Sequence, residues 1–174
     1  MRFLRMTSEL KQGGMAILVT LGMALVWGCH TPPKGSKFNV ELTPGNDVKT
    51  ASVEVDLIGA NAREKENWGT YPIDKYWEPG DAGRRDADKY TIRLDDGKPK
   101  ILVLPDPIWD KWLSHGAIYL VVIAHLPGDF KGLARDPRRE ILSLEASRWK
   151  TSKSLLQIEI QERFIKILTV EKTR

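Results

Sequence analysis

The sequence predicts a mostly β domain, a two-layer antiparallel β-sandwich with one short helix. Eight short segments either alternate apolar and polar residues or form brief apolar runs, as strands do. They follow one another at the short spacing that is typical of sandwiches. Only one segment has the apolar spacing of a helix together with a helix start and end. The predicted strands are 38–42, 53–57, 90–94, 101–104, 118–124, 141–144, 156–160 and 164–170.

The spacing of apolar residues distinguishes two kinds of predicted strand. Val53, Val55 and Leu57 alternate with polar residues, which indicates a strand with one buried face. Residues 118–124 are apolar at nearly every position and rich in β-branched side chains. A strand that is apolar on both faces is covered on both sides, so we expect 118–124 to lie in the middle of a sheet.

The predicted helix covers residues 106–116. Asp106 is a suitable N-cap, Pro107 suits the first helical position, and Gly116 suits the end. Its apolar side chains fall on one helical face, which consists of Ile108, Trp109, Trp112 and Leu113. We expect this helix to cover an open end of the sandwich, with both tryptophans in the core.

Two stretches, 60–89 and 127–138, are predicted to be long loops. Both are rich in charged residues and turn formers, and the first also carries several aromatic residues. Long loops on a rigid sheet are where binding residues are usually found. The aromatic residues either pin the loop to the sandwich or anchor a partner. The dibasic pairs are either solvated or dock an acidic patch. The candidate partner-binding residues are Trp68, Tyr76, Trp77, Arg84, Arg85, Arg138 and Arg139.

The sequence predicts no enzyme, no cofactor and no metal site. Its three histidines are scattered, and it contains no nucleophile elbow, phosphate-binding glycine loop or dinucleotide fingerprint. Asp74, Asp86 and Asp106 lie near tryptophans, as the acids of a glycosidase would. Lysines and arginines are interleaved with these acids, however, which is typical of a solvated loop.

Residues 1–28 have the organisation of a secretory signal peptide. Basic residues precede an apolar stretch at 15–27, and the small Gly28 precedes Cys29, the only cysteine of the chain. The segment Val26-Trp27-Gly28-Cys29 resembles the lipobox of bacterial lipoproteins. In that class the leader is cut before the cysteine, whose thiol and new amino group are acylated.

The alternative for this segment is a transmembrane anchor with an incidental cysteine. The apolar stretch has 13 residues, whereas a helix needs about 20 to cross a bilayer. Two acyl chains on Cys29 suffice for stable membrane attachment. The next residue is His30 and not aspartate, which by resemblance to lipoproteins implies a lipid anchor at the periplasmic face of the outer membrane.

The mature chain is then expected to comprise a lipidated tether, 29–37, and a sandwich domain, 38–174. The tether contains two prolines and a glycine and has no apolar periodicity. Removing the leader's three basic residues and Glu9 leaves 24 basic and 22 acidic residues, a net charge of +2. This charge gives no reason to expect a nucleic-acid partner. With one cysteine, the chain forms no internal disulfide.

Four features together resemble the outer-membrane lipoprotein of type VI secretion systems, the TssJ family. They are the lipobox, the strand at 52–58, the strand at 117–124 with the loop after it, and Arg148-Trp149 before two closing strands. The resemblance implies a transthyretin-like β-sandwich with a helical addition. It also implies a loop that binds the periplasmic domain of an inner-membrane secretion protein, here 60–89 or 127–138. An envelope lipoprotein that binds a glycan or lipid is the alternative.

Overall fold

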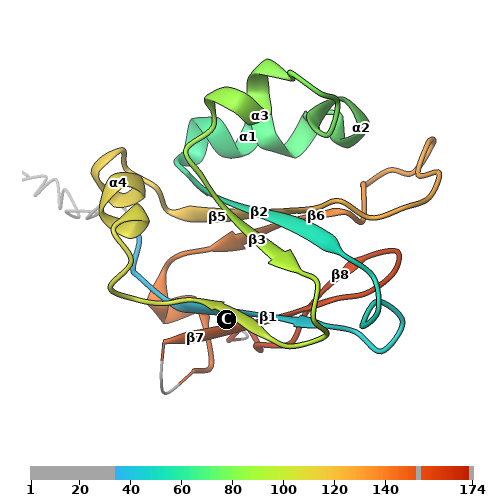
Figure 1. The fold of residues 1–174 in the computed structure, drawn as a ribbon. Coiled ribbons are helices and arrows are strands. Elements are labelled where there is room, and N and C mark those ends of the chain that lie inside the picture. The colour runs from blue at the N-terminus through green and yellow to red at the C-terminus, as the bar shows by residue number, and fades with distance from the viewer. Residues whose placement is uncertain (1–33, 152–153, 173–174) are drawn as a thin grey trace, which may run out of the picture. The chain divides into compact units, whose positions relative to one another are not determined.

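The computed structural model describes residues 34–151 and 154–172, so the predicted signal peptide, Cys29 and the start of the tether lie outside the described residues. Strands form two four-stranded sheets, ordered β4-β1-β7-β8 and β3-β2-β5-β6 (Figure 1). The strands are β1 Asn39–Pro44, β2 Val53–Ala60, β3 Lys89–Leu94, β4 Lys100–Leu102, β5 Tyr119–Ala124, β6 Arg139–Ser143, β7 Leu155–Ile160 and β8 Ile165–Ile167. Each predicted strand therefore corresponds to an observed one, and the β-sandwich is confirmed.

The main core lies between the two sheets. Alternate residues of β1, β2, β5 and β7 point into it, and many of their side chains are fully buried. They include Val40, Leu42, Val55, Leu57, Leu120, Val122, Leu156 and Ile158. As predicted, β5 is an inner strand, paired with β2 on one side and β6 on the other.

One strand pair departs from the predicted antiparallel arrangement. β1 and β7 run parallel, with Val40 opposite Leu156 and Leu42 opposite Ile158. Parallel neighbours need a long crossover connection. Here the whole β3-β2-β5-β6 sheet lies between β1 and β7 in the sequence, and alternation within each strand carries no information about such a pairing.

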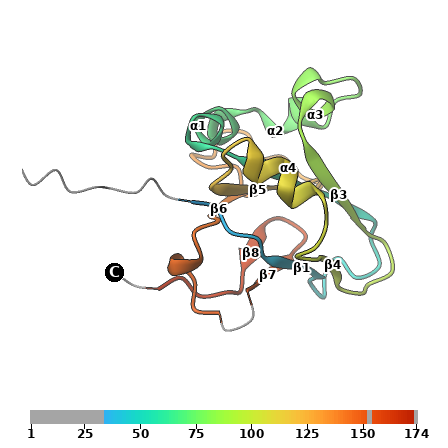
Figure 2. The same ribbon diagram turned by 90° about the vertical axis from the view of Figure 1, so that its left-hand side faces the viewer.

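The predicted helix is α4, Ile108–Ser114. The Asp106 carboxylate accepts the Ile108 N–H at 2.9 Å, and Gly116 follows the helix with a φ of 78°, a conformation that glycine adopts without strain. Trp109 and Trp112 are buried and their rings meet edge to face. Figures 1 and 2 show α4 at one end of the sandwich, where its tryptophans close the main core.

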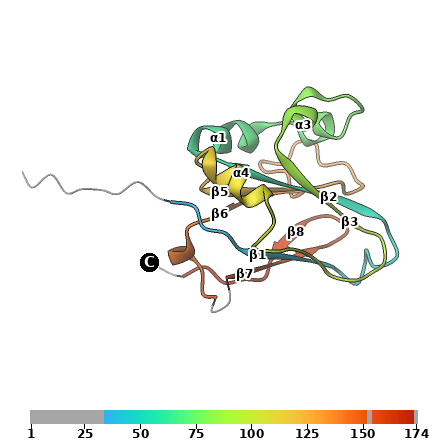
Figure 3. The same ribbon diagram turned by 60° about the vertical axis from the view of Figure 1, so that its left-hand side comes forward.

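The prediction of a loop at 60–89 is wrong. This segment contains three short helices, α1 Ala62–Thr70, α2 Ile73–Tyr76 and α3 Ala82–Asp86. Figure 3 shows α1 and α3 over the outer face of the β3-β2-β5-β6 sheet, which is therefore covered on both sides. We call α1, α2 and α3 the helical layer. A capping box starts α1, since Asn61 accepts the Glu64 N–H and the Glu64 carboxylate accepts the Asn61 N–H.

The segment before β1 and two connections between strands complete the fold. Gly35 is buried, and the Ser36 N–H donates to the Leu144 carbonyl at 2.8 Å, so the last residues of the predicted tether pack on the domain. Residues 127–138 form a loop, as predicted, between β5 and β6. A short 3₁₀ helix, Ala146–Arg148, precedes β7.

Candidate functional site

A second apolar core joins the helical layer to the sheet beneath it. Ile58 and Ala60 of β2 and the odd-numbered side chains of β5 face outward from the sandwich into this layer. Aromatic residues of the helical layer cover them with edge-to-face or tilted ring contacts, which are favourable geometries for such pairs. The aromatic residues are Trp68, Tyr71, Tyr76 and Trp77.

Asp56 is the centre of a polar network inside this second core. Its carboxylate is fully buried, although strand alternation predicted that it faces solvent. Tyr76 Oη and Arg84 Nε each donate to Asp56 at 2.8 Å, and Thr91 Oγ1 donates as well. Burial and the neighbouring Asp56 charge raise the pKa of the Tyr76 hydroxyl far above its ordinary value. A buried carboxylate with three donors is satisfied, so this network fixes the helical layer to β2.

The Trp77 ring lies between the guanidinium of Arg84 and the imidazole of His125. The Arg84 guanidinium lies over its ring, 4.1 Å from the centroid, and the His125 ring stacks on it at 4.5 Å. The Trp77 indole N–H is buried without a hydrogen-bond acceptor among the described residues. Arg84 also pairs with Glu54. These contacts place Trp77 and Arg84 in the connection between the helical layer and the sandwich.

The pair Arg138 and Arg139 is buried and makes internal contacts. Arg138 forms ion pairs with Asp136 at 2.6 Å and with Asp74 of α2 at 2.7 Å, and its guanidinium lies over Phe130. Hydrogen bonding to Asp136 raises the pKa of Arg138. Arg138 thereby ties the 127–138 loop to the helical layer.

Arg139 fixes the end of α1. It donates to the carbonyls of Tyr71, at 2.7 Å, and Gly69, and burial lowers the pKa of its guanidinium. Arg85, in contrast, is exposed and pairs with its neighbour Asp86. Of the seven candidate partner-binding residues, Arg85 thus offers the most accessible side chain, Trp68, Trp77 and Arg84 are partly accessible, and the most buried are Tyr76, Arg138 and Arg139.

Asp81 holds α3 against α1. Its carboxylate accepts from the Arg84 N–H at 2.8 Å and from Tyr71 Oη at 2.8 Å. Burial opposes ionisation, but these hydrogen bonds prevail and lower the pKa of Asp81. A Cβ on Gly83 would lie 2.4 Å from Tyr71 Oη, so only glycine allows this close approach.

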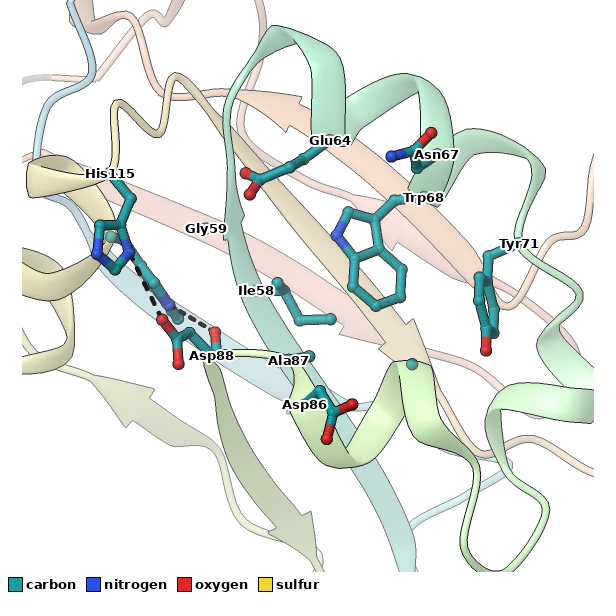
Figure 4. A pocket seen from close by; sticks show the side chains of 12 residues that line it. Ile58, Gly59, Glu64, Asn67, Trp68, Tyr71, Asp86, Ala87, Asp88 and His115 are labelled. Carbon is teal, nitrogen blue, oxygen red and sulfur yellow. Dashed lines mark hydrogen bonds and ion pairs between the residues drawn. The ribbon is translucent and has the colours of Figure 1, made fainter.

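A pocket of about 350 Å³ opens between α1, α3 and α4 (Figure 4). Its floor consists of Ile58 and Gly59 of β2 and Ala87, and Trp68 and Trp112 form its walls. Figure 4 shows the Trp68 indole beside Ile58, facing the opening. The Trp112 ring lies so close to β2 that a Cβ on Gly59 would be 2.3 Å from Trp112 Cγ. Glycine at this position of β2 therefore allows the close packing of the Trp112 ring that lines the pocket.

Carboxylates and one histidine form the rim of the pocket. Glu64 lies on the opposite side of the opening from Asp86, and Asp88 lies beside His115 (Figure 4). Asp88 pairs with Lys111 at 2.6 Å and is 3.6 Å from His115 Nδ1. Sequence reasoning did not identify this pocket, although the Asn61 and Glu64 capping box is a recognisable signal for the helix that forms one wall.

The described residues contain neither a candidate metal site nor a candidate membrane-spanning helix. Within 34–151 and 154–172, no three His, Cys, Asp or Glu side chains are grouped so that they could hold a metal ion. In the same part of the chain, no helix combines the length and apolar composition that crossing a bilayer requires.

Comparison with known proteins finds similarity to solved structures in fold. A scan against protein-family models and a search of curated proteins each find no match. Among solved structures, a chain of a structure described as "Type VI membrane complex" has a TM-score of 0.52 at 16% identity, covering 78% of this chain and 99% of that chain. A chain of "T6SS protein TssM C-terminal domain (869-1107) from EAEC" has a TM-score of 0.52 at 15% identity, covering 75% and 99%.

A third similar structure is that of a membrane-bound secretion component. It is Serratia marcescens Lip, "a membrane bound component of the Type VI Secretion System", with a TM-score of 0.50 at 15% identity, covering 80% of this chain and 99% of that chain. At such identities the likeness establishes the fold. This chain therefore has the β-sandwich fold of type VI secretion lipoproteins, as its resemblance to the TssJ family predicted.

Proposed function

We propose that this protein is a non-enzymatic, lipid-anchored component of a type VI secretion membrane complex that docks a periplasmic domain of an inner-membrane protein. The observation that supports this most strongly is the sandwich it shares with Serratia marcescens Lip over nearly the whole of that chain. The predicted signal peptide, which ends in a segment that resembles a lipobox, adds support from an independent part of the sequence. Both features are expected of an envelope scaffold.

The lipid anchor is attached to Cys29 and holds the protein at the periplasmic face of the outer membrane. Acylation would attach the chain to the membrane through two or more hydrocarbon chains, each methylene contributing about 0.8 kcal/mol. The domain would then face the periplasm on a tether that ends at Gly35, where the chain becomes buried.

We place the docking surface on the helical layer. Trp68 and Arg85 are our candidates for direct contact, because Trp68 lines an open pocket and Arg85 is exposed. Trp77 and Arg84 flank this surface. Tyr76, Arg138 and Arg139 would act by holding the layer in position, since their polar atoms contact Asp56, Asp74, Asp136 and two backbone carbonyls.

Replacing Cys29 with serine tests the anchor and the role together. Cells that produce the wild-type protein should incorporate labelled palmitate into it and should retain it in the outer-membrane fraction. The Cys29→Ser variant should be unlabelled and should fail to support effector secretion in a strain that lacks the chromosomal copy. Full secretion by an unlabelled, soluble variant would contradict the proposal.

A matched pair of surface variants tests the docking surface. Arg85→Ala should reduce co-purification of the inner-membrane partner from detergent extracts without changing the unfolding midpoint. Arg93→Ala removes another largely exposed arginine, which lies on β3 and pairs with Glu54, and should leave co-purification unchanged. Equal effects of the two changes would remove the helical layer from consideration.

A further inference from the structure

We infer that the pocket between α1, α3 and α4 receives an arginine or lysine side chain of the docked protein partner. The identity of this occupant as part of a partner protein rests on the proposed function. The chemistry of the occupant rests on the pocket itself, through its volume, its apolar floor and its rim of carboxylates.

The size and lining of the pocket fit a long side chain with an apolar stem. Its volume of about 350 Å³ is at the lower end of the range for ligand sites, too small for an element of secondary structure. Ile58 and Ala87 provide an apolar floor, and Trp68 provides an aromatic wall. Lysine and arginine side chains lay their methylene stems along such surfaces while the charged end stays near water.

The rim of the pocket favours a positive end group. Glu64, Asp86 and Asp88 contribute carboxylates. Asp86 already pairs with Arg85, and Asp88 pairs with Lys111 and lies near His115. The Asp86 pair is exposed and the Asp88 pair is half-buried, so both pairs are weak. A second cation can share such carboxylates, whereas an acidic side chain would be repelled.

Glu64 is the carboxylate with the most free capacity. One of its oxygens accepts the Asn61 N–H at 2.9 Å, and no cation pairs with it among the described residues. A carboxylate has two oxygens and can accept a bidentate arginine. Trp68, four residues later on the same face of α1, adds a ring over which a cation is attracted. Glu64 and Trp68 therefore present one carboxylate and one aromatic face to the same opening, as Figure 4 shows.

The test is a titration of the full-length, lipidated protein with short peptides in detergent. The tryptophans of the protein are replaced with 5-fluorotryptophan, and their signals are observed by fluorine NMR. The probes are acetylated, amidated Gly-Arg-Gly, Gly-Lys-Gly and Gly-Glu-Gly. The Trp68 signal, assigned with Trp68→Phe, should shift saturably with the two basic peptides and not with the acidic one. The signal of Trp149, which is buried in the main core away from the pocket, should not move.

Two charge-neutralising variants on α1 provide the matched comparison. Glu64→Gln keeps an oxygen that accepts the Asn61 N–H, so the capping box survives while the charge is lost. It should weaken binding of Gly-Arg-Gly about fivefold, the upper value for one exposed ion pair. Glu66→Gln makes the same change at an exposed position outside the pocket and should leave binding unchanged. Asp86→Asn gives a second rim variant, which should also weaken binding if Glu64→Gln unfolds.

Several results would overturn the inference. They are a non-saturable shift, an equal response to Gly-Glu-Gly, or equal effects of Glu64→Gln and Glu66→Gln. Saturable binding of purified muropeptides in place of the basic peptides would also overturn it and would favour the glycan-binding alternative. The titration needs neither secretion nor a partner, so its failure leaves the outcome of the Cys29→Ser experiment unaffected.

Discussion

Replacing Arg139 with alanine tests whether this arginine stabilises the fold or is free to bind a partner. Arg139 is on β6 and is only 9% exposed. Its guanidinium donates to the carbonyls of Gly69 and Tyr71, at the end of α1 where no further helical N–H is available. Truncation to alanine would leave both carbonyls without this donor and would loosen α1 from the sheet.

The expected loss can be derived from these two bonds. A hydrogen bond that involves a charged group contributes about 1.5–3 kcal/mol, so two bonds give an upper value of about 3–6 kcal/mol. Burial lowers the pKa of Arg139, which shows that desolvation already offsets part of this gain. Water entering the vacated space would satisfy the carbonyls in part. We therefore expect Arg139→Ala to lower the free energy of unfolding by about 2–3 kcal/mol.

Urea denaturation followed by tryptophan fluorescence measures this loss. Arg139→Lys keeps the charge but not the planar pair of donors, and its stability should fall between wild type and Arg139→Ala. Arg85→Ala is the control, because Arg85 is 65% exposed and Asp86 is its one ion-pair partner among the described residues. Its stability should stay within about 0.5 kcal/mol of wild type. An Arg139→Ala variant as stable as Arg85→Ala would refute the internal role of Arg139.

Four further predictions concern the packing and the acid stability of the helical layer and its surroundings. Gly59→Ala should lower the free energy of unfolding by about 1–3 kcal/mol, because the added Cβ would lie 2.3 Å from the Trp112 ring. Gly69→Ala meets no atom within 4 Å and lies in α1, so it should be neutral or raise stability by up to about 1 kcal/mol in the same urea series. Tyr76→Phe keeps the ring but removes a donor to buried Asp56, so thermal unfolding should report a loss of about 1–2 kcal/mol. Hydrogen bonds from Arg138 outweigh burial and lower the pKa of Asp136 below its ordinary value of about 3.9. Its stabilisation is therefore complete above that value and is lost as the pH falls through the lowered pKa, and Asp136→Asn should flatten the acid limb of stability against pH.

The strands were predictable because burial on one or both faces leaves a direct trace in the sequence. Alternation identified β2 at Val53, Val55 and Leu57, and the nearly uninterrupted apolar run identified β5 as an inner strand. The parallel pairing of β1 with β7 is not predictable from local patterns, because it joins two strands that are separated in the sequence by all four strands of the other sheet. Local alternation specifies which face of a strand is buried but not its neighbours.

The candidate site was predicted in part. The aromatic residues of 60–89 were recognised as either pinning or binding residues, and most of them pin the segment to the sheet. The sequence predicts that Arg138 and Arg139 are either solvated or dock an acidic patch, but both are buried. Asp136, a partner of Arg138, is two positions away, but the other partners, Asp74 and the carbonyls of Gly69 and Tyr71, lie more than sixty positions away in the sequence. Contacts at such separation leave no local pattern.

Two features of the sequence together predict the helical layer, although neither does so alone. β5 is apolar on both faces, and an inner strand of this kind requires an apolar layer on each side of its sheet. The second sandwich sheet covers only one side, so another segment must cover Val121 and Ile123. The segment 60–89 is rich in aromatic residues and begins with the capping box of Asn61 and Glu64. α1 has no fully buried residue of its own, so its polar composition gives no helical pattern of apolar residues. The indication that a segment covers this face comes instead from the apolar outer side chains of β5.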